Sequence, residues 1–161
     1  MDVNLSVSDG AFAGAVDAGQ LYQNSGAAAG VNINIVQEPA DGYWSNVWLK
    51  KPWCACYWSG RATEDWMFST AYESGVPWND TGWENERFQS LLMQGRAELD
   101  TGLRGEIYRE MQAICRDEGG TVVPMYQNYV DAKSNRVEHS GQTGNLWMLD
   151  NLRSCKRWWS A

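Results

Sequence analysis

Residues 85–137 constrain the fold of this 161-residue chain more than any other part, because they carry two helical patterns in succession. In both segments apolar side chains recur every three or four residues, which is the spacing of a helix with one buried face. The sequence therefore predicts two amphipathic helices. Their apolar residues are Phe88, Leu91, Leu92 and Leu99 in the first, and Leu103, Ile107, Tyr108, Met111 and Ile114 in the second.

The ends of the second helix carry their own signals. Asp100 precedes its first turn, where a carboxylate can accept hydrogen bonds from free backbone N–H groups, and we expect it to be the N-cap. Gly119 and Gly120 follow the last apolar residue, and glycine commonly ends a helix in the left-handed conformation. The next residues, Thr121–Tyr126, predict a buried strand that is broken by Pro124.

The N-terminal residues show a strand, a helix and a second strand. Apolar and polar residues alternate over residues 3–7 and again over residues 31–35, as in half-buried strands. Between them a helix rich in small residues is predicted from about Ala11 to Ala29, and Gly30 is expected to end it. Such a unit is typical of a right-handed crossover between parallel strands.

Shorter elements are predicted from residue 41 onwards. Asp41 is expected to cap a short helix, and Cys54–Trp58 is predicted to form another strand. Thr63 provides a capping hydroxyl for the helix that follows, and Glu64 and Asp65 place negative charge at the positive end of its dipole.

The order of these elements resembles the C-terminal part of family 5 extracellular solute-binding proteins, the dipeptide- and oligopeptide-binding type that feeds ABC importers. Four motifs carry the resemblance: AAGVNINIV at residues 28–36, ELD…R…Y.EMQ at residues 98–112, the proline-containing segment 121–126, and the closing RWW at residues 157–159. The resemblance implies an α/β chain that forms one lobe of a type II periplasmic-binding-protein-like fold. That lobe would have a mixed sheet with flanking helices, and the chain would be a C-terminal fragment.

The same resemblance implies a domain organisation and a location. Residues 1–127 would be the C-terminal lobe, and residues 128–161 a return segment and tail that pack on a first lobe. The start of the chain lacks the basic and apolar segments of a signal peptide, which also favours a fragment of an exported, periplasmic protein. In such a fragment, the first lobe that would bury Trp158 and Trp159 is absent. We therefore expect these side chains to be buried by self-association into a homo-oligomer.

Composition excludes several classes of partner. The formal net charge of −7 argues against binding to nucleic acid or to anionic membrane surfaces. The apolar content of 43% is enough for one domain to bury a core, and no apolar run is long enough to span a bilayer. The partners that the resemblance implies are a small molecule or peptide ligand and the membrane permease of an ABC transporter.

The cysteines are informative mainly by exclusion. The chain has no C-x-x-C motif and a single histidine, so we predict no metal site and no cofactor. Two of the cysteines are two residues apart on a predicted strand, share a face and cannot easily bond to each other. Free thiols at small core positions are the favoured interpretation, and a single disulfide, as some members of the resembled family carry, stays open. The residues are Cys54, Cys56, Cys115 and Cys155.

Catalysis finds little support, and we predict that the chain is not an enzyme. A serine or cysteine hydrolase needs a histidine base near its nucleophile, and His139 lies in a polar segment without an acidic partner pattern. Helix capping explains the adjacent acids Glu64 and Asp65, and the glycines of residues 10–14 lack the lysine of a phosphate-binding loop. A hydrolase is the weakest alternative.

Ligand binding is best placed at residues 56–68, which combine a strand end, a glycine-containing loop and a helix start. Ligands of open α/β sheets collect at the carboxyl ends of strands, where a helix N-terminus supplies free N–H groups. Two residues of the turn-rich loop 76–83 are secondary candidates. The predicted site comprises Trp58, Ser59, Gly60, Arg61, Glu64, Asp65 and Trp66, with Asn79 and Trp83 as the secondary pair.

Arg61 is the central residue of this prediction. Its planar guanidinium can hold a carboxylate or phosphate, and Trp58 and Trp66 can stack on a sugar ring or an apolar side chain. In the resembled family this loop faces the cleft, and an aspartate there commonly holds the ammonium group of the ligand. Gly60 and Arg61 occupy the matching positions here, which argues against simple dipeptide recognition through an amine–carboxylate pair. The predicted ligand class is peptide-like or opine-like small molecules.

Two alternatives accompany this prediction. Arg61 can instead form only a surface salt bridge with Glu64 or Asp65. The chain can also be a stand-alone glycan-binding module, because it contains ten tryptophans, although core packing is the favoured account of most of them. The tryptophans considered for such a stacking surface are Trp44, Trp48, Trp53, Trp78 and Trp83.

Overall fold

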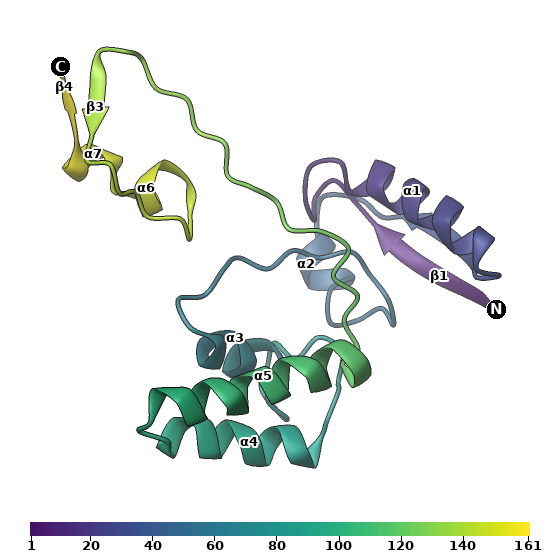
Figure 1. Ribbon diagram of the computed structural model, residues 1–161. Coiled ribbons are helices and arrows are strands. Elements are labelled where there is room, and N and C mark those ends of the chain that lie inside the picture. Colours follow the sequence, from purple (N-terminus) through teal and green to yellow (C-terminus); the bar gives the residue numbers. More distant parts are fainter. The chain divides into compact units, whose positions relative to one another are not determined.

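The structure is a computed structural model that describes residues 1–161, and its chain forms two units, Met1–Trp58 and Ser59–Ala161. Figure 1 shows their helices and strands in chain order, and both units together make a mixed α/β chain. The predicted boundary between a lobe (residues 1–127) and a tail (residues 128–161) stays a prediction. No helix is both long enough and apolar enough to cross a membrane.

The first unit contains the predicted strand–helix–strand crossover. Strand β1 (Asp2–Val7), helix α1 (Ala15–Ala28) and strand β2 (Asn32–Gln37) follow one another, and the two strands pair in parallel. The register places Leu5 opposite Ile35, so the apolar residues of both strands share a face. Residues of α1 pack on that face, as the alternation of apolar and polar residues predicts.

Two glycines let α1 lie close to the sheet. A Cβ on Gly19 would lie 3.0 Å from Val7 Cγ1, and a Cβ on Gly26 would lie 2.8 Å from Ile33 Cδ1. Val7 is fully buried and Ile33 is nearly so, which leaves little room for either side chain to move. The small residues of α1 therefore serve close packing.

The start of α1 differs from the prediction. The helix begins at Ala15 instead of near Ala11, because the residues before it form turns. Ala15 N–H donates to Phe12 O at 3.1 Å, and Gly14 has a φ of +82°. The prediction for the other end is confirmed, since Gly30 follows the helix with a φ of +77°.

Helix α2 (Tyr43–Asn46) is the predicted short helix, but the prediction that Asp41 caps it is wrong. Its N-cap is Gly42 with a φ of +75°, and no side chain caps its N–H groups. The buried Tyr43 anchors the helix, because its hydroxyl lies 2.7 Å from the carbonyl oxygen of Ala55. Burial raises the pKa of this hydroxyl, so it stays a neutral donor.

The predicted strand Cys54–Trp58 is reduced to one isolated bridge. Ser6 N–H donates to Trp53 O at 3.1 Å, and Ala55 N–H donates to Ser6 O at 2.9 Å. The following residues have no ladder: β1 ends at Val7, and the carbonyl oxygen of Ala55 accepts a hydrogen bond from the Tyr43 hydroxyl.

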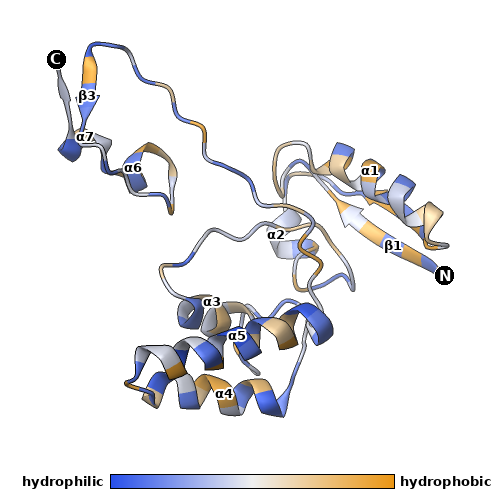
Figure 2. Cartoon of the chain, in the orientation of Figure 1, coloured by the Kyte–Doolittle hydropathy of each residue, from blue (hydrophilic) through white to orange (hydrophobic).

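Three helices form the core of the second unit: α3 (Glu64–Ala71), α4 (Glu86–Ala97) and α5 (Thr101–Glu118). Figure 2 shows hydrophobic and hydrophilic residues interspersed along α4 and α5, and this confirms the two predicted amphipathic helices. The buried residues at their contact are Phe68, Phe88, Leu91, Leu92 and Met111.

Two leucines of the predicted apolar faces are exposed instead, Leu99 at 89% and Leu103 at 53%. α4 ends at Ala97 and Glu98 is extended, so Leu99 lies in the connection rather than on a helical face. Leu103 lies in the first turn of α5, about two turns before the buried Met111. Helical spacing alone did not reveal where the core ends.

One end of α5 follows the prediction and the other does not. Asp100 is confirmed as the N-cap, because its Oδ1 accepts hydrogen bonds from Gly102 N–H at 2.8 Å and Leu103 N–H at 2.9 Å. The predicted positive-φ stop at Gly119 is wrong, since its φ is −63° and its ψ is 143°. Glycine is suited to this position for another reason: a Cβ there would collide with the carbonyl oxygen of Cys115.

No strand forms at Thr121–Tyr126, and residues 121–134 contain neither helix nor strand. Val122 is 56% exposed and Tyr126 is 92% exposed, so the predicted burial is wrong as well. A strand needs a neighbouring strand for its backbone groups, and the strands that pair in the structure are β1 with β2 and β3 with β4.

The C-terminal residues form a second small sheet. Strand β3 (Val137–His139) pairs antiparallel with strand β4 (Trp158–Ser160), and the short helices α6 (Met148–Leu152) and α7 (Ser154–Arg157) lie between them in the chain. His139, predicted in a loop, therefore ends a strand and stacks on Trp158 at 5.4 Å between ring centroids. The expected single mixed sheet is replaced by two separate two-stranded sheets.

Candidate functional site

The loop before α3 brings Arg61 and Trp66 together. Arg61 Nη1 donates to the carbonyl oxygen of Ser59 at 2.8 Å, and its Cζ lies 5.5 Å from the centroid of the Trp66 ring. This distance is within the range of a cation–π contact. The guanidinium is thus held by local backbone on one side and by an aromatic face on the other.

The N-terminus of α3 is built as the sequence predicts. Thr63 Oγ1 accepts a hydrogen bond from Trp66 N–H at 3.2 Å, which confirms its role as the N-cap. Glu64 is exposed in the first turn, and the Trp66 ring is 55% exposed. Together with Arg61, these side chains present a cation, an anion and a ring face on one short segment.

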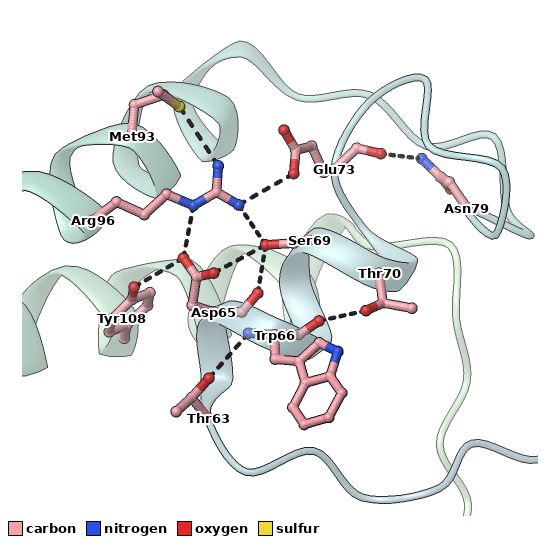
Figure 3. Close-up of polar contacts among 10 residues, drawn as sticks. All are labelled: Thr63, Asp65, Trp66, Ser69, Thr70, Glu73, Asn79, Met93, Arg96 and Tyr108. Atoms are coloured by element: carbon pink, nitrogen blue, oxygen red, sulfur yellow. Dashed lines mark hydrogen bonds and ion pairs between the residues drawn. The ribbon is translucent and has the colours of Figure 1, made fainter.

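Asp65, in contrast, is committed to contacts between helices (Figure 3). Its Oδ2 accepts hydrogen bonds from Arg96 Nε at 2.9 Å and from the Tyr108 hydroxyl at 3.1 Å, and its Oδ1 accepts one from Ser69 Oγ at 3.1 Å. Partial burial, and then the nearby Asp65 carboxylate, raise the pKa of Tyr108. The hydroxyl therefore remains a donor, and the carboxylate connects α3 with α4 and α5.

Arg96 is the residue that the sequence did not single out. Besides Asp65 it contacts Ser69 Oγ and lies 3.3 Å from Glu73 Oε2, so one side chain from α4 joins three groups of α3 and the residues after it. The hydrogen bond with Asp65 is the main cause of the raised pKa of Arg96. Asp65 and Arg96 are 31 positions apart, and no local spacing signals such a pair.

The two secondary candidates hold the turn-rich loop in place. Asn79 Nδ2 donates to the carbonyl oxygen of Trp83 at 2.8 Å, and Asn79 Oδ1 accepts a hydrogen bond from Thr81 Oγ1 at 3.2 Å. The Trp83 ring packs against Phe88 with 5.1 Å between centroids and against Tyr72 with 6.4 Å. Trp83 thus belongs to the edge of the helical core.

Trp58 is the last residue of the first unit and belongs to a chain of edge-to-face aromatic contacts there. Its ring lies 6.4 Å from that of Trp48, while Trp44 lies 5.8 Å from Trp48 and 5.5 Å from Tyr57. Another tryptophan considered for glycan stacking, Trp53, packs instead against Tyr22 of α1 at 5.8 Å.

The cysteines and acids do not gather into a metal-binding cluster. The structure contains no group of three or more histidine, cysteine, aspartate or glutamate side chains that could hold an ion. Cys54, Cys56 and Cys115 are half-buried, and Cys155 is exposed. Burial raises the pKa of Cys115 to about 11.

Comparison with known proteins gives two similarities. A stretch of 48 residues is 44% identical to the oligopeptide-binding protein OppA of Bacillus subtilis (strain 168), covering 30% of this chain and 9% of OppA. Among solved structures, HbpA2 from Haemophilus parasuis matches with a TM-score of 0.60 and 17% identity, over 74% of this chain and 25% of HbpA2. No family model matches the chain.

These similarities bear on the fold more than on the site. The likeness to HbpA2 agrees with the predicted periplasmic-binding-protein-like class, whereas the outline of a complete lobe stays a prediction. The chain spans about a quarter of the length of HbpA2. The ligand-binding role of the predicted site residues is likewise still a prediction.

Proposed function

We propose that this chain is part of the periplasmic substrate-binding component of an ABC importer, which binds a small peptide-like or opine-like solute and delivers it to a membrane permease. The observation that carries this proposal is the 44% identity with an oligopeptide-binding protein over 48 residues. The likeness in fold to HbpA2 supports it independently of sequence, because the two chains share only 17% identity. A complete cleft would need a second lobe in addition to these residues.

Within this proposal, Arg61 and Trp66 are the main ligand contacts. The guanidinium would bind an anionic group of the solute, and the exposed ring would cover an apolar part of it. Glu64 at the start of α3 is available for a positively charged group, while Ser59 and Gly60 shape the loop. Asp65 would act indirectly, through its bonds to Arg96 and Tyr108 that hold α3 in place.

The test is calorimetry with a panel of peptides, opines and sugars. It would be applied to this chain and to the longest open reading frame that encodes it. Affinity in such proteins comes from closure of two lobes, so we expect the 161-residue chain to bind nothing tighter than about 1 mM, or about −4 kcal/mol. The longer protein should bind a peptide or an opine. Micromolar binding by this chain alone would overturn the half-site proposal.

The glycan-binding alternative is tested by the sugar arm of the same panel. One observation favours it: Trp44 and Tyr57 are 40% and 59% exposed and lie 5.5 Å apart between ring centroids. Stacking on a sugar needs an open ring face. If sugars bind the chain and Trp44→Ala abolishes that binding, the module is a glycan binder and the transport proposal fails.

A further inference from the structure

A small pocket lies at the carboxyl end of β2, within the first unit and away from the loop before α3 in the sequence. Its volume is about 180 Å³, and its lining residues include the acidic Glu38 and Asp41, the basic Lys51 and Asn46. Pockets that enclose a whole ligand are usually about 300–1,000 Å³, so this one suits a very small molecule or a single functional group. The carboxyl ends of strands are where ligands of open α/β sheets bind.

Two of the residues that line the pocket are buried in the core of the first unit. Tyr43 and Val47 line it and are 1% and 3% exposed. The Tyr43 hydroxyl lies between the carbonyl oxygens of Ala55 (2.7 Å) and Ser6 (3.2 Å), which joins α2 to β1. These contacts fix the hydroxyl end of the Tyr43 side chain, which lines the pocket.

The carboxylate of Glu38 is also oriented in advance. Ser6 is 5% exposed, and its Oγ donates to Glu38 Oε1 at 2.9 Å. The backbone N–H of Glu38 donates to Val7 O at 2.8 Å, which continues the strand ladder by one residue. A second donor can still bind the other carboxylate oxygen, because a carboxylate accepts several hydrogen bonds.

The charged residues that line the pocket do not form ion pairs with one another. None of Glu38, Asp41 and Lys51 forms a salt bridge within 4.0 Å. Two carboxylates and one ammonium suit a molecule that carries both signs of charge, with its positive group on the acidic side. A metal ion fits less well, because no three acidic, cysteine or histidine groups converge there.

We propose that this pocket binds the zwitterionic end group of a small α-amino acid-type molecule. Glu38 and Asp41 hold the ammonium group, Lys51 holds the carboxylate, and the Ser6–Glu38 hydrogen bond orients the acidic side. The proposal concerns only residues 6–51 and does not depend on the transport function.

The experiment is an NMR titration of the whole 161-residue chain with glycine, ethylammonium and acetate, followed through the backbone amides of residues 38–51. We expect glycine to bind with a Kd on the order of 10 mM, ethylammonium several-fold more weakly, and acetate without saturation. Glu38→Gln keeps the size of the side chain and a partner for Ser6, and should weaken glycine binding by about fivefold or more. Lys51→Met should remove the advantage of glycine over ethylammonium.

The matched control is Asp17→Asn, which removes an exposed carboxylate from the first turn of α1 and should leave every titration unchanged. Three outcomes would overturn the proposal: acetate binding as well as glycine, equal glycine affinity in Glu38→Gln and wild type, or displacement of glycine by millimolar Ca²⁺. The last result would identify the pocket as a cation site. Circular dichroism of each variant shows whether the fold is retained, and if Glu38→Gln fails this check, Asp41→Asn takes its place with the same expectation.

Discussion

At the residue scale, two arginines lie against α3 in different surroundings. Arg96 bonds to Asp65 at 2.9 Å and lies near Glu73, so its charge is used inside the helical unit. Arg61 bonds to the backbone of Ser59 and stacks on a ring that is 55% exposed. The predicted alternative is a surface bridge from Arg61 to Glu64 or Asp65. At Asp65 such a bridge would compete with Arg96 for the same carboxylate.

Under the proposed function, Arg61→Ala should lower the affinity for the ligand. A charge-assisted contact contributes on the order of 1.5–3 kcal/mol, so we expect a loss of roughly 10- to 150-fold. Arg61→Lys should also lose affinity, because an ammonium cannot reproduce the planar fork. Calorimetry at low and high salt measures the ligand affinity of each variant. The free energy of unfolding should change by less than about 1 kcal/mol. Equal affinities for wild type and both variants would remove Arg61 from the site.

Gly26→Ala and Gly105→Ala should change stability in opposite directions. At Gly26 the new Cβ would meet Ile33 Cδ1 at 2.8 Å inside a packed layer, so we expect a loss of about 1–3 kcal/mol. At Gly105, inside α5, nothing lies within 4 Å, and the better helix propensity of alanine should add about 0.5–1 kcal/mol. Urea unfolding followed by circular dichroism compares the two. Equal effects would mean that α1 does not approach the sheet this closely.

Cys115 should react with iodoacetamide much more slowly than Cys155. The thiolate is the nucleophile, and with a pKa of about 11 only about one Cys115 in a thousand is ionised at pH 8. Cys155 is exposed, so the reagent reaches it freely. Mass spectrometry of peptides after timed labelling measures which of the two cysteines is alkylated first. In urea the two cysteines should be labelled at comparable rates. Comparable labelling rates in the native protein would contradict the packing of Cys115 on the helical core.

At the element scale, α4 and α5 are fixed mainly by their caps and their buried faces. Asn85 Oδ1 accepts Phe88 N–H at 2.9 Å at the start of α4, and Asp100 caps α5 through two N–H groups. Arg87 of α4 and Glu110 of α5 form a pair at 2.8 Å, but both are about half exposed, so its contribution is small. Burial of Phe88 and the residues around it therefore stabilises the helix pair more than this ion pair does.

Asp100→Ala should destabilise the helical unit by about 1 kcal/mol, because it removes the acceptor for two free N–H groups of α5. Asp117→Ala is the matched control: it also removes one aspartate from the same region, but at the other end of the helix, where negative charge is unfavourable. The measurement is urea unfolding at constant ionic strength. If the two variants lose the same stability, the loss in Asp100→Ala does not come from the cap.

At the scale of the whole molecule, residues 121–134 expose apolar side chains without secondary structure. Val122 and Val123 are both more than half exposed, and Tyr126 is 92% exposed. Apolar surface of this kind is commonly buried by association, and backbone without a ladder can pair with another chain.

We therefore predict that the chain forms a dimer or a larger assembly at high concentration. Light scattering coupled to size exclusion measures its mass. Val122→Lys combined with Val123→Lys should shift the chain towards the monomer, because it adds charge to the exposed segment. Gln20→Lys combined with Gln112→Lys adds the same charge at exposed polar positions and should not. A clean 18.1 kDa wild-type monomer would contradict the prediction.

Local patterns in the sequence determined most helices and the parallel crossover. Helical spacing, the caps Thr63 and Asp100, and the alternation in β1 and β2 each act within a few residues, so they could be read from neighbours in the chain. The loop at Arg61 was also predicted from local order. What these patterns could not supply was any contact between distant residues.

The tertiary structure decided which of the predicted residues are free to act. Asp65 is bound by a residue 31 positions away, and Trp83 lies against a core that forms only when α4 folds beside α3. The segment Thr121–Tyr126 has the composition of a strand but no neighbour to pair with, so it stays without a ladder. Strand propensity describes the backbone conformation that a segment favours. Its hydrogen bonds and its burial depend on which other residues pack beside it in the tertiary structure.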